Sequence, residues 1–358
     1  MRRGYGYDTY RGRSRLRTAL TVLIVALLIV LAAAVAAFFL LQKYVVYTDD
    51  GRARLEVPFF QQQTAPAVSS GDGEPPVVVV TAEPAPEPTP APALLVLSLP
   101  RSALTDGTAA AQAEAAGAGA VCFDMKADDG TLGYVSALPA AVSLGTSAAE
   151  PGLNEAISAL NASGLYTVAR VSCFRDNLAP RTDNSLAVRT NSGYNWRDAG
   201  DIRWMNPAVE AARDYVAGVC RELAALGFDE IVLDNACYPV DGRLDYIRRG
   251  ATYDTANLSQ PLDLFYAQVK EALADTPQVT LSITASRAAL TGAAGDLSGQ
   301  TPELLARSAQ RLWTPAAEWE GADAAAFTAA GLDPARIVLT GVSAAPAGLA
   351  GALRPSAS

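Results

Sequence analysis

The sequence contains no histidine, and its four cysteines include no CxxC pair. The usual spacings of histidine and cysteine ligands in zinc sites are therefore absent, and we expect neither a metal ion nor any other cofactor. Because no imidazole is present, any general acid–base catalysis must come from carboxylates.

The sequence also lacks the glycine-rich turns of nucleotide-binding proteins. Neither GxGxxG nor GxxxxGK[ST] follows any of the early strand-like runs, which removes the main reason to expect a nucleotide-binding doubly wound sheet. Basic residues are in the minority, with 28 Lys and Arg against 37 Asp and Glu and a net charge of −9. Because no basic face is available to neutralise phosphates, we expect no nucleic-acid partner.

The few cysteines follow the predicted core. Cys122, Cys173 and Cys237 each lie in or just beyond an apolar strand-like run, and Cys220 lies within a helical pattern. Buried free thiols are the simplest interpretation. A disulfide between Cys173 and Cys237 is the alternative, because an exported domain would permit it and the two strands would be neighbours in the fold predicted below.

The first 41 residues have the pattern of a membrane anchor. Six arginines among residues 2–17 precede an uncharged and almost uniformly apolar stretch, Ala19–Leu41. At about 1.5 Å per residue this stretch spans the roughly 30 Å hydrocarbon core, and the arginines place its N-terminal side in the cytoplasm. We therefore predict a cytoplasmic tail at 1–18 and a single-pass cell-membrane anchor at 19–41. A cleaved secretory signal is the alternative, although the usual signal core is shorter.

Residues 42–93 are predicted to form a proline-rich extracytoplasmic stalk. From Thr64 to Ala93 the composition is dominated by Pro, Ala, Glu, Ser and Gly, without the apolar periodicity needed to bury a core. This composition is typical of an extended spacer, and a docking site for a proline-binding module is the alternative. Residues 94–358 suffice for one domain with a sizeable core.

Strand-like and helix-like patterns alternate through residues 94–358. The clearest helix has Asn206 as its cap and Pro207 at its first position, and it stops at Gly227. Strict alternation implies a mainly parallel sheet, either doubly wound or closed as a barrel, and the length favours an α/β fold of the (β/α)8 TIM type. The seven strand-like runs are Leu94–Leu99, Ala118–Asp124, Tyr166–Ser172, Glu230–Asp234, Gln278–Thr284, Arg311–Thr314 and Arg336–Val342.

The predicted barrel is incomplete at its C-terminal end. Only residues 343–358 follow the seventh strand-like run. We therefore expect either seven recognisable strands or a disordered closure.

Carboxylates stand at the ends of the predicted strands. Asp124 closes the second run in VCFDMKADDG, Asp176 follows the third in ARVSCFRD, and Asp234 closes the fourth in FDEIVLDNACYP. In a barrel the carboxyl ends of all strands meet at one face, where active sites are built. The sequence therefore predicts a site at this face.

Three longer segments carry a resemblance to a known family. VCFDMKADDGTLGYVS, GLYTVARVSCFRD and WRDAGDIRWMNPAVEAARDYVAGVCRELAALGFDEIVLDNACYP resemble the putative glycoside hydrolase domain family, a TIM-barrel group distantly similar to the α-amylase-like glycosidases. The resemblance covers residues 94–245 in detail. It implies an extracytoplasmic barrel that acts on polysaccharide, with the fourth-strand carboxylate, here Asp234, as catalytic nucleophile or base.

Glycoside cleavage needs two carboxyl groups, one protonated to assist the leaving oxygen and one ionised opposite it. Asp124 and Asp128, with Lys126 between them, are the candidates to act with Asp234. For Asp124 the alternative is a structural role as a buried partner of Lys126 or Arg170.

Substrate contacts are predicted on and beside the same strands. Exposed rings in the loop before the helix at 206–227 would stack on sugar faces; Trp196 is the better candidate there, because Trp204 lies next to the helix cap and has loop packing as its alternative, and Tyr194 is a third ring. The predicted substrate-binding residues are Lys126, Arg170, Asp176, Trp196, Trp204, Asn235 and Tyr238.

The sequence departs from the family pattern in three places. Cys237 stands where the family has an arginine after the fourth strand, and Thr284 and Ser286 occupy the region where the fifth strand usually ends with a carboxylate. The region of the sixth strand and its following loop keeps its proline but carries Trp313, Glu318 and Trp319 in altered positions. Glu318 is therefore a further candidate for the catalytic acid.

Two functions stay open at this point. One is a cell-surface glycosidase in which Asp234 acts with Asp124, Asp128 or Glu318. The other is a degenerate barrel that binds cell-wall or capsular glycan without cutting it. A purely structural envelope protein would leave the strand-end carboxylates unexplained. Because the stalk keeps the barrel close to the membrane, we expect envelope polysaccharide as the partner.

Overall fold

The computed structural model describes residues 45–47, 53–55 and 93–355, except residues 294, 320–322 and 345. The predicted tail at 1–18 and anchor at 19–41 lie outside the described residues, as does most of the stalk. The described residues include no helix with the length and hydrophobicity of a membrane span. The chain divides into two units, Met1–Glu83 and Pro84–Ser358.

The first unit contains a small antiparallel sheet. Strands β1 (Val45–Tyr47) and β2 (Ala53–Leu55) pair there, with Val46 opposite Arg54. This short pairing lies in the first part of the predicted stalk, before the proline-rich stretch that begins at Thr64.

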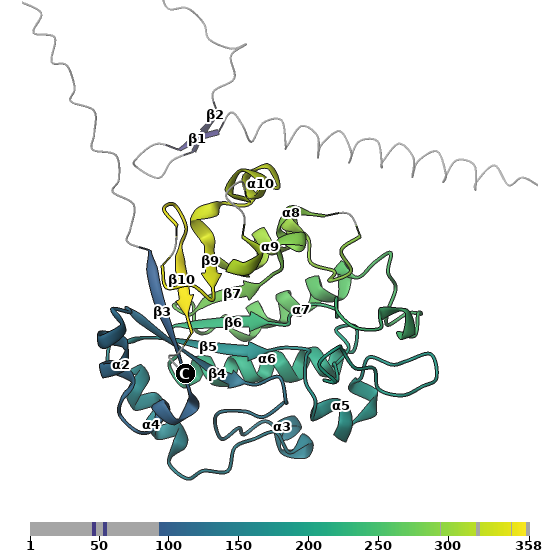
Figure 1. Ribbon diagram of the computed structural model, residues 1–358, viewed down its shortest axis with the longest axis horizontal. Coiled ribbons are helices and arrows are strands. Elements are labelled where there is room, and N and C mark those ends of the chain that lie inside the picture. The colour runs from purple at the N-terminus through teal and green to yellow at the C-terminus, as the bar shows by residue number, and fades with distance from the viewer. Residues whose placement is uncertain are drawn as a thin grey trace, which may run out of the picture. The chain divides into compact units, whose positions relative to one another are not determined.

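The second unit is a closed eight-stranded parallel barrel (Figure 1). The seven predicted strands are confirmed, with ends that differ by at most two residues from the prediction, and the predicted incomplete closure is wrong. The strands in barrel order are β10 (Gly351–Arg354), β3 (Leu94–Leu99), β4 (Ala120–Lys126), β5 (Tyr166–Ser172), β6 (Glu230–Asp234), β7 (Thr280–Thr284), β8 (Arg311–Pro315) and β9 (Ile337–Thr340).

The strand that closes the barrel, β10, has little apolar signal. It pairs in parallel with β3, with Gly351 opposite Leu94, and with β9 on its other side. A Cβ atom at Gly351 would lie 2.3 Å from the carbonyl oxygen of Leu94, so the close approach of the two backbones requires glycine there. The residue that permits closure is thus one that weakens a strand pattern in the sequence.

Helices and short 3-10 turns connect the strands. The α-helices are α2 (Ala109–Ala116), α3 (Pro139–Leu144), α4 (Leu153–Asn161), α5 (Ala179–Thr182), α6 (Glu210–Ala225), α7 (Ser259–Ala272), α8 (Arg287–Thr291), α9 (Pro302–Ser308) and α10 (Asp323–Ala329). The 3-10 helices are η2 (Arg101–Leu104), η3 (Asn184–Leu186), η4 (Leu244–Tyr246), η5 (Ala316–Glu318) and η6 (Pro334–Arg336).

The predicted start of α6 is three residues too early. Asn206 accepts a hydrogen bond on its side-chain oxygen from the backbone N–H of Ala208, and the N–H of Val209 donates to the carbonyl of Asn206. These bonds close a turn before the helix rather than its first turn. Regular helix therefore begins at Glu210.

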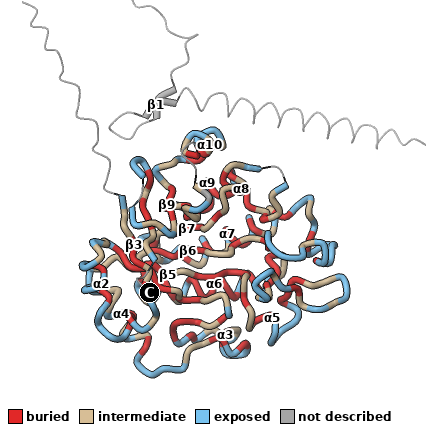
Figure 2. The backbone as a smooth tube through the Cα atoms, viewed as in Figure 1, coloured by how far each residue is buried: buried red, intermediate tan, exposed pale blue. Residues whose placement is uncertain are grey.

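The core has two layers, and buried residues follow the strands and the helix faces that meet them (Figure 2). In β6, Ile231 and Leu233 belong to the layer shared with the helices, whereas Val232 belongs to the layer inside the barrel. Because side chains alternate along a strand, Glu230 and Asp234 share the inward face with Val232. The interior layer consists of Val96, Ala120, Cys122, Val168, Val232, Trp313 and Val338.

Glu230 lies on the amino-terminal side of this layer and is fully buried. Its carboxylate pairs with Arg311 and accepts hydrogen bonds from Ser282 Oγ at 2.5 Å, the Tyr166 hydroxyl at 3.0 Å and Trp313 Nε1 at 3.1 Å. Each oxygen has partners, as a buried carboxylate requires. Glu230 is therefore fully paired inside the barrel, and the candidate site lies at the opposite, carboxyl end of the strands.

Candidate active site

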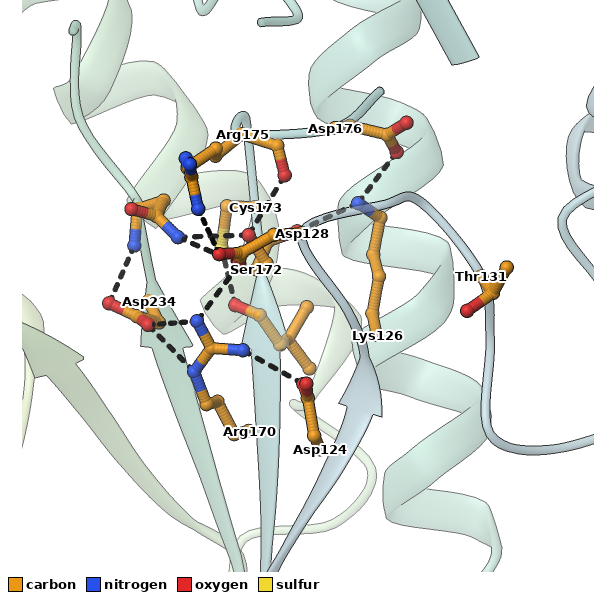
Figure 3. A network of polar contacts seen from close by, with 12 residues as sticks. Asp124, Lys126, Asp128, Thr131, Arg170, Ser172, Cys173, Arg175, Asp176 and Asp234 are labelled. Atoms are coloured by element: carbon orange, nitrogen blue, oxygen red, sulfur yellow. Dashed lines mark hydrogen bonds and ion pairs between the residues drawn. The ribbon is translucent and has the colours of Figure 1, made fainter. Parts of the chain in front are cut away.

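The candidate site lies at the carboxyl ends of β4, β5 and β6 (Figure 3). Asp124 is opposite Arg170 in the β4–β5 pairing, and Ser172 is opposite Asp234 in the β5–β6 pairing. Three neighbouring parallel strands therefore bring Asp124 to one side of Arg170 and Asp234 to the other. The prediction that the strand-end residues Asp124 and Asp234 lie at one face of the barrel is confirmed. Their catalytic roles stay predictions.

Arg170 binds three carboxylates at once. Its Nε donates to Asp234 Oδ2 at 2.7 Å, its Nη1 to Asp124 Oδ1 at 2.8 Å and its Nη2 to Asp128 Oδ1 at 3.0 Å. Its Nη2 also lies 2.5 Å from Asp234 Oδ2. The side chains of Asp124, Asp128 and Asp234 are 43%, 31% and 21% exposed, so all three face a solvent-accessible site.

Asp128 is held from a second direction by residues that follow β5. Arg175 pairs with Asp128 through Nη1 and with Asp198 through Nε at 2.6 Å. The side-chain amide of Asn235 donates to Ser172 Oγ at 2.9 Å and to Asp128 Oδ1 at 3.3 Å. The network therefore extends from the strand ends to the loop beyond β5.

Asn235 is one of two non-glycine residues with positive φ among the described residues, at 48°. Asparagine tolerates this left-handed conformation better than most residues. Its backbone N–H donates to Asp234 Oδ1 at 2.9 Å, so the local turn orients the carboxylate that ends β6. The side chain of Asn235 thus serves the network, while any contact with a substrate stays a prediction.

The environments of two carboxyl groups push their pKa values in opposite directions. Burial raises the pKa of Asp124 above its usual value, and the charge of Arg170 only partly offsets this. Burial also acts to raise the pKa of Asp128, but the Arg170 charge, the Ser172 hydrogen bond and Arg175 outweigh it, and the pKa falls below its usual value. The two neighbouring carboxyl groups therefore differ in how readily they bind a proton.

Burial acts to lower the pKa of Arg170, but the surrounding aspartates outweigh it and the pKa is raised. The guanidinium is therefore a permanent cation between the carboxylates. Within the part of the chain that the structure describes, no group of three His, Cys, Asp or Glu residues is arranged to hold a metal ion. A cation is already present at the centre of the site, supplied by the chain itself.

The predicted contact of Lys126 and Asp176 with substrate is wrong. Both side chains are 0% exposed, and Lys126 Nζ lies 2.7 Å from Asp176 Oδ2. The same Nζ donates to the Ser172 carbonyl at 2.7 Å, and Asp176 Oδ1 accepts from the backbone N–H groups of Leu178 and Ala179. In Figure 3 Lys126 points away from Arg170, toward Asp176. This buried ion pair therefore has a structural role next to the site.

The prediction that Trp196 and Trp204 are exposed rings that stack on sugars is also wrong. Trp196 is 2% exposed and Trp204 is 6% exposed, and their indole N–H groups donate to the Arg243 carbonyl and to Asp198 Oδ2, both at 2.9 Å. Tyr238 is 1% exposed. The tryptophans therefore pack the loops, and the alternative of loop packing for Trp204 is correct. Tyr194, at 75% exposed, is the ring of this region that faces solvent.

The four cysteines are free thiols. Cys122, Cys173 and Cys220 are buried and Cys237 is partly buried, so the simplest interpretation holds and the Cys173–Cys237 disulfide does not form. Burial raises the pKa of Cys122 and of Cys220 to about 12. None of these thiols is poised as a nucleophile, because the reactive form is the thiolate.

Sequence reasoning missed Arg175, Asp198 and the hydroxyl of Ser172. Arg175 stands directly before Asp176 in the quoted ARVSCFRD segment, so its place beside the strand end was a usable signal.

Thr284 ends β7 as expected, without a carboxylate. Glu318 is the last residue of η5, and the structure does not describe its side chain; its role as an acid stays a prediction.

A closed (β/α)8 barrel with carboxylates at the carboxyl ends of its strands is the architecture found in TIM-barrel glycoside hydrolase-like domains. The chain belongs to the family described as "Putative glycosyl hydrolase domain", whose model matches residues 109–310, more than half of the sequence. The family resemblance stated from the sequence is thereby confirmed.

Several solved structures are similar to this chain. A hypothetical protein from Ruminiclostridium thermocellum is 24% identical, with 52% of this chain and 96% of that chain covered and a TM-score of 0.45. The PgaB (BpsB) glycoside hydrolase domain from Bordetella bronchiseptica is 14% identical, with 71% and 85% covered and a TM-score of 0.49. A variant of the PelA glycoside hydrolase domain from Pseudomonas aeruginosa is 16% identical, with 70% and 84% covered and a TM-score of 0.40. Comparison with curated proteins gives no match.

Proposed function

We propose that this protein is a membrane-anchored, extracytoplasmic glycoside hydrolase that cleaves cell-wall or exopolysaccharide glycan. Asp234 acts as nucleophile or base, and Asp124 acts as the general acid. The observation that carries the proposal is the pair of partly exposed carboxylates from β4 and β6 on either side of Arg170. The family match supports the reaction class.

The two aspartates suit complementary roles. Asp124 has a raised pKa and is the more exposed of the two, so it holds a proton more readily than an ordinary aspartate and can deliver it to the leaving glycosidic oxygen. Asp234 is oriented by Arg170 and by the Asn235 N–H. From that position it attacks the anomeric carbon or removes a proton from the attacking water.

The Asp124→Asn substitution tests the acid. It is expected to lower kcat about 10²- to 10⁴-fold and to change the pH profile of kcat/KM. A general acid works while protonated, so wild-type activity falls as the pH rises through the pKa of Asp124. That pKa is raised, so the fall comes at a higher pH than for an ordinary aspartate.

The same profile measured on the Asp128→Asn variant is the control. Because the pKa of Asp128 is lowered, this carboxyl is ionised through the working range, and the alkaline limb should survive its replacement. An alkaline limb that is unchanged in Asp124→Asn would assign the acid to another group.

We propose further that residues 19–41 anchor the chain in the cell membrane, with the N-terminus in the cytoplasm and the barrel outside. The six arginines before the apolar stretch support this orientation. Full-length protein is expected to stay in the membrane fraction after alkaline carbonate extraction, and protease added to spheroplasts is expected to remove the barrel. Release of a shortened soluble chain would show a cleaved signal instead.

One observation favours a second function, glycan binding without cleavage. All three site carboxylates are paired with Arg170, and β7 ends in Thr284 rather than in a carboxylate. A barrel that had lost its proton donor would keep a polar groove and bind a chain without cutting it. Binding of glycan by wild-type protein with no release of products would support this second function.

A further inference from the structure

A separate cavity lies in the loop between β6 and α7. Its volume is about 400 Å³, and it is lined by Tyr238, by residues near the end of this loop and by the start of α7. The volume falls within the range of small-molecule sites. The side chains that matter here are those of Tyr238, Arg249, Tyr253, Asp254, Asn257 and Gln260.

The floor of this cavity is rigid. The rings of Tyr238 and Tyr253 meet edge to face, with centroids 5.6 Å apart, and the two residues are 1% and 2% exposed. The backbone N–H of Tyr238 donates to the Ser298 carbonyl at 2.8 Å, and Tyr253 exchanges backbone hydrogen bonds with Gly250. The cavity is therefore formed before any ligand arrives, which lowers the entropic cost of binding.

The rim of the cavity keeps unused donors and acceptors. No carboxylate of the described residues lies within ion-pair distance of Arg249. Asp254 uses Oδ1 to accept from the Ala256 N–H, which leaves Oδ2 available. The Asn257 amide donates to Gln260 Oε1 at 2.6 Å, which leaves the Asn257 oxygen and the Gln260 nitrogen free.

This set of groups matches a sugar better than an ion. Each hydroxyl both donates and accepts a hydrogen bond, and the rim offers donors and acceptors together. Arg249 and Asp254 carry opposite charges, so the cavity has no excess of either sign that would favour a charged ligand.

We propose that this cavity is an accessory subsite that binds one neutral saccharide unit of the glycan chain. Tyr238 follows Asp234 by four residues, and the loop leaves the carboxyl end of β6, so the subsite lies on the same end of the barrel as the candidate active site. The choice of a saccharide as ligand rests on the proposed function. The subsite holds a sugar residue while the reacting linkage is placed at Asp234 and Asp124.

The test is the binding of short oligosaccharides to the full-length protein, measured by ligand-observed NMR titration. The probes are maltotriose, cellotriose, N-acetylglucosamine trimer and, as a charged comparison, trigalacturonate. Wild-type protein is expected to bind at least one of the three neutral trimers. Arg249→Gln and Asn257→Ala are each expected to weaken that binding by about tenfold or more, because each removes hydrogen bonds to the ligand.

A matched control variant shows whether a loss of binding is specific to the cavity. Arg221→Gln, which changes an exposed arginine of α6 outside the cavity, is expected to bind the trimer as wild type does. Unchanged affinity in both Arg249→Gln and Asn257→Ala overturns the subsite, as does a wild-type protein that binds no neutral trimer. Trimer binding lost only in the cavity variants, with no glycan cleavage by wild type, would keep the subsite and refute the hydrolase.

Discussion

Replacing Asp234 by Asn is expected to lower glycan release by the full-length protein about 10²- to 10⁴-fold. Asparagine keeps the size of the side chain and can still accept from Arg170 Nε, which donates to Asp234 Oδ2 at 2.7 Å. It carries no negative charge, so it can neither attack the anomeric carbon nor serve as a base. The rate of reducing-end release from a soluble glycan substrate measures the effect.

A matched control keeps this result from being read as a folding defect. Asp275→Asn changes an exposed aspartate between α7 and β7, at the opposite end of the barrel, and should release glycan at the wild-type rate. Asp234→Asn should unfold in urea cooperatively, as wild type does. A properly folded Asp234→Asn variant with wild-type activity would remove Asp234 from the mechanism.

The second large effect concerns stability. Lys126→Met leaves Asp176 without its cation in a place where both side chains are fully buried. Removing one partner of such a pair costs about 3 to 5 kcal/mol, because a buried charge is left uncompensated. Asp176 keeps two backbone N–H donors, which soften the loss without replacing the charge. Urea unfolding of the full-length protein measures the change.

The exposed pair Arg307–Asp263 supplies the comparison. Its side chains are 57% and 54% exposed and its atoms are 2.8 Å apart, so Arg307→Met should cost at most about 1 kcal/mol. The double variant Lys126→Met with Asp176→Leu should recover part of the stability lost in Lys126→Met, since no lone charge is then buried. Equal losses in Lys126→Met and Arg307→Met would show that the buried pair has no special role.

Much of the barrel could be predicted because its strands are apolar runs between helical patterns. Glu230–Asp234 carries three consecutive apolar residues between two acidic ones, and the structure confirms the strand with those bounds. The closing strand β10 could not be predicted, because Gly351 and Ala352 give no apolar alternation. It is defined by its pairing with β3 and β9, and β3 lies at the other end of the domain sequence, so no local pattern indicates it.

The positions of the site carboxylates could be predicted from the sequence, whereas the roles of the cationic side chains were harder to predict. Asp124 and Asp234 follow from their places at strand ends, and Arg170 was one of two alternative partners for Asp124. Lys126 was misassigned because a register shift between Asp124 and Lys126 interrupts the alternation of β4. Lys126 then pairs with Val171, which lies in the core shared with the helices, and its ammonium lies 5.9 Å from the ring of Tyr215 in α6.

The burial of Trp196 could not be predicted from the sequence, because it depends on how the loops fold against each other. Trp196 stands in a polar stretch, which suggested an exposed platform. In the structure the hairpin around Arg189 and Asn195 folds against the segment that contains η4, and the indole of Trp196 is buried against the Arg243 carbonyl. That contact joins residues 47 positions apart, and no local pattern encodes it.

The proposed hydrolase activity is tested by glycan release by the full-length wild-type protein from a panel of purified cell-wall polymers and exopolysaccharides, with binding to each polymer measured in parallel. At least one polymer is expected to be bound and cleaved, with new reducing ends that are absent from the Asp234→Asn and Asp124→Asn samples. Polymers that are bound equally by all three proteins and cleaved by none would contradict the proposed activity and leave a glycan-binding barrel in its place.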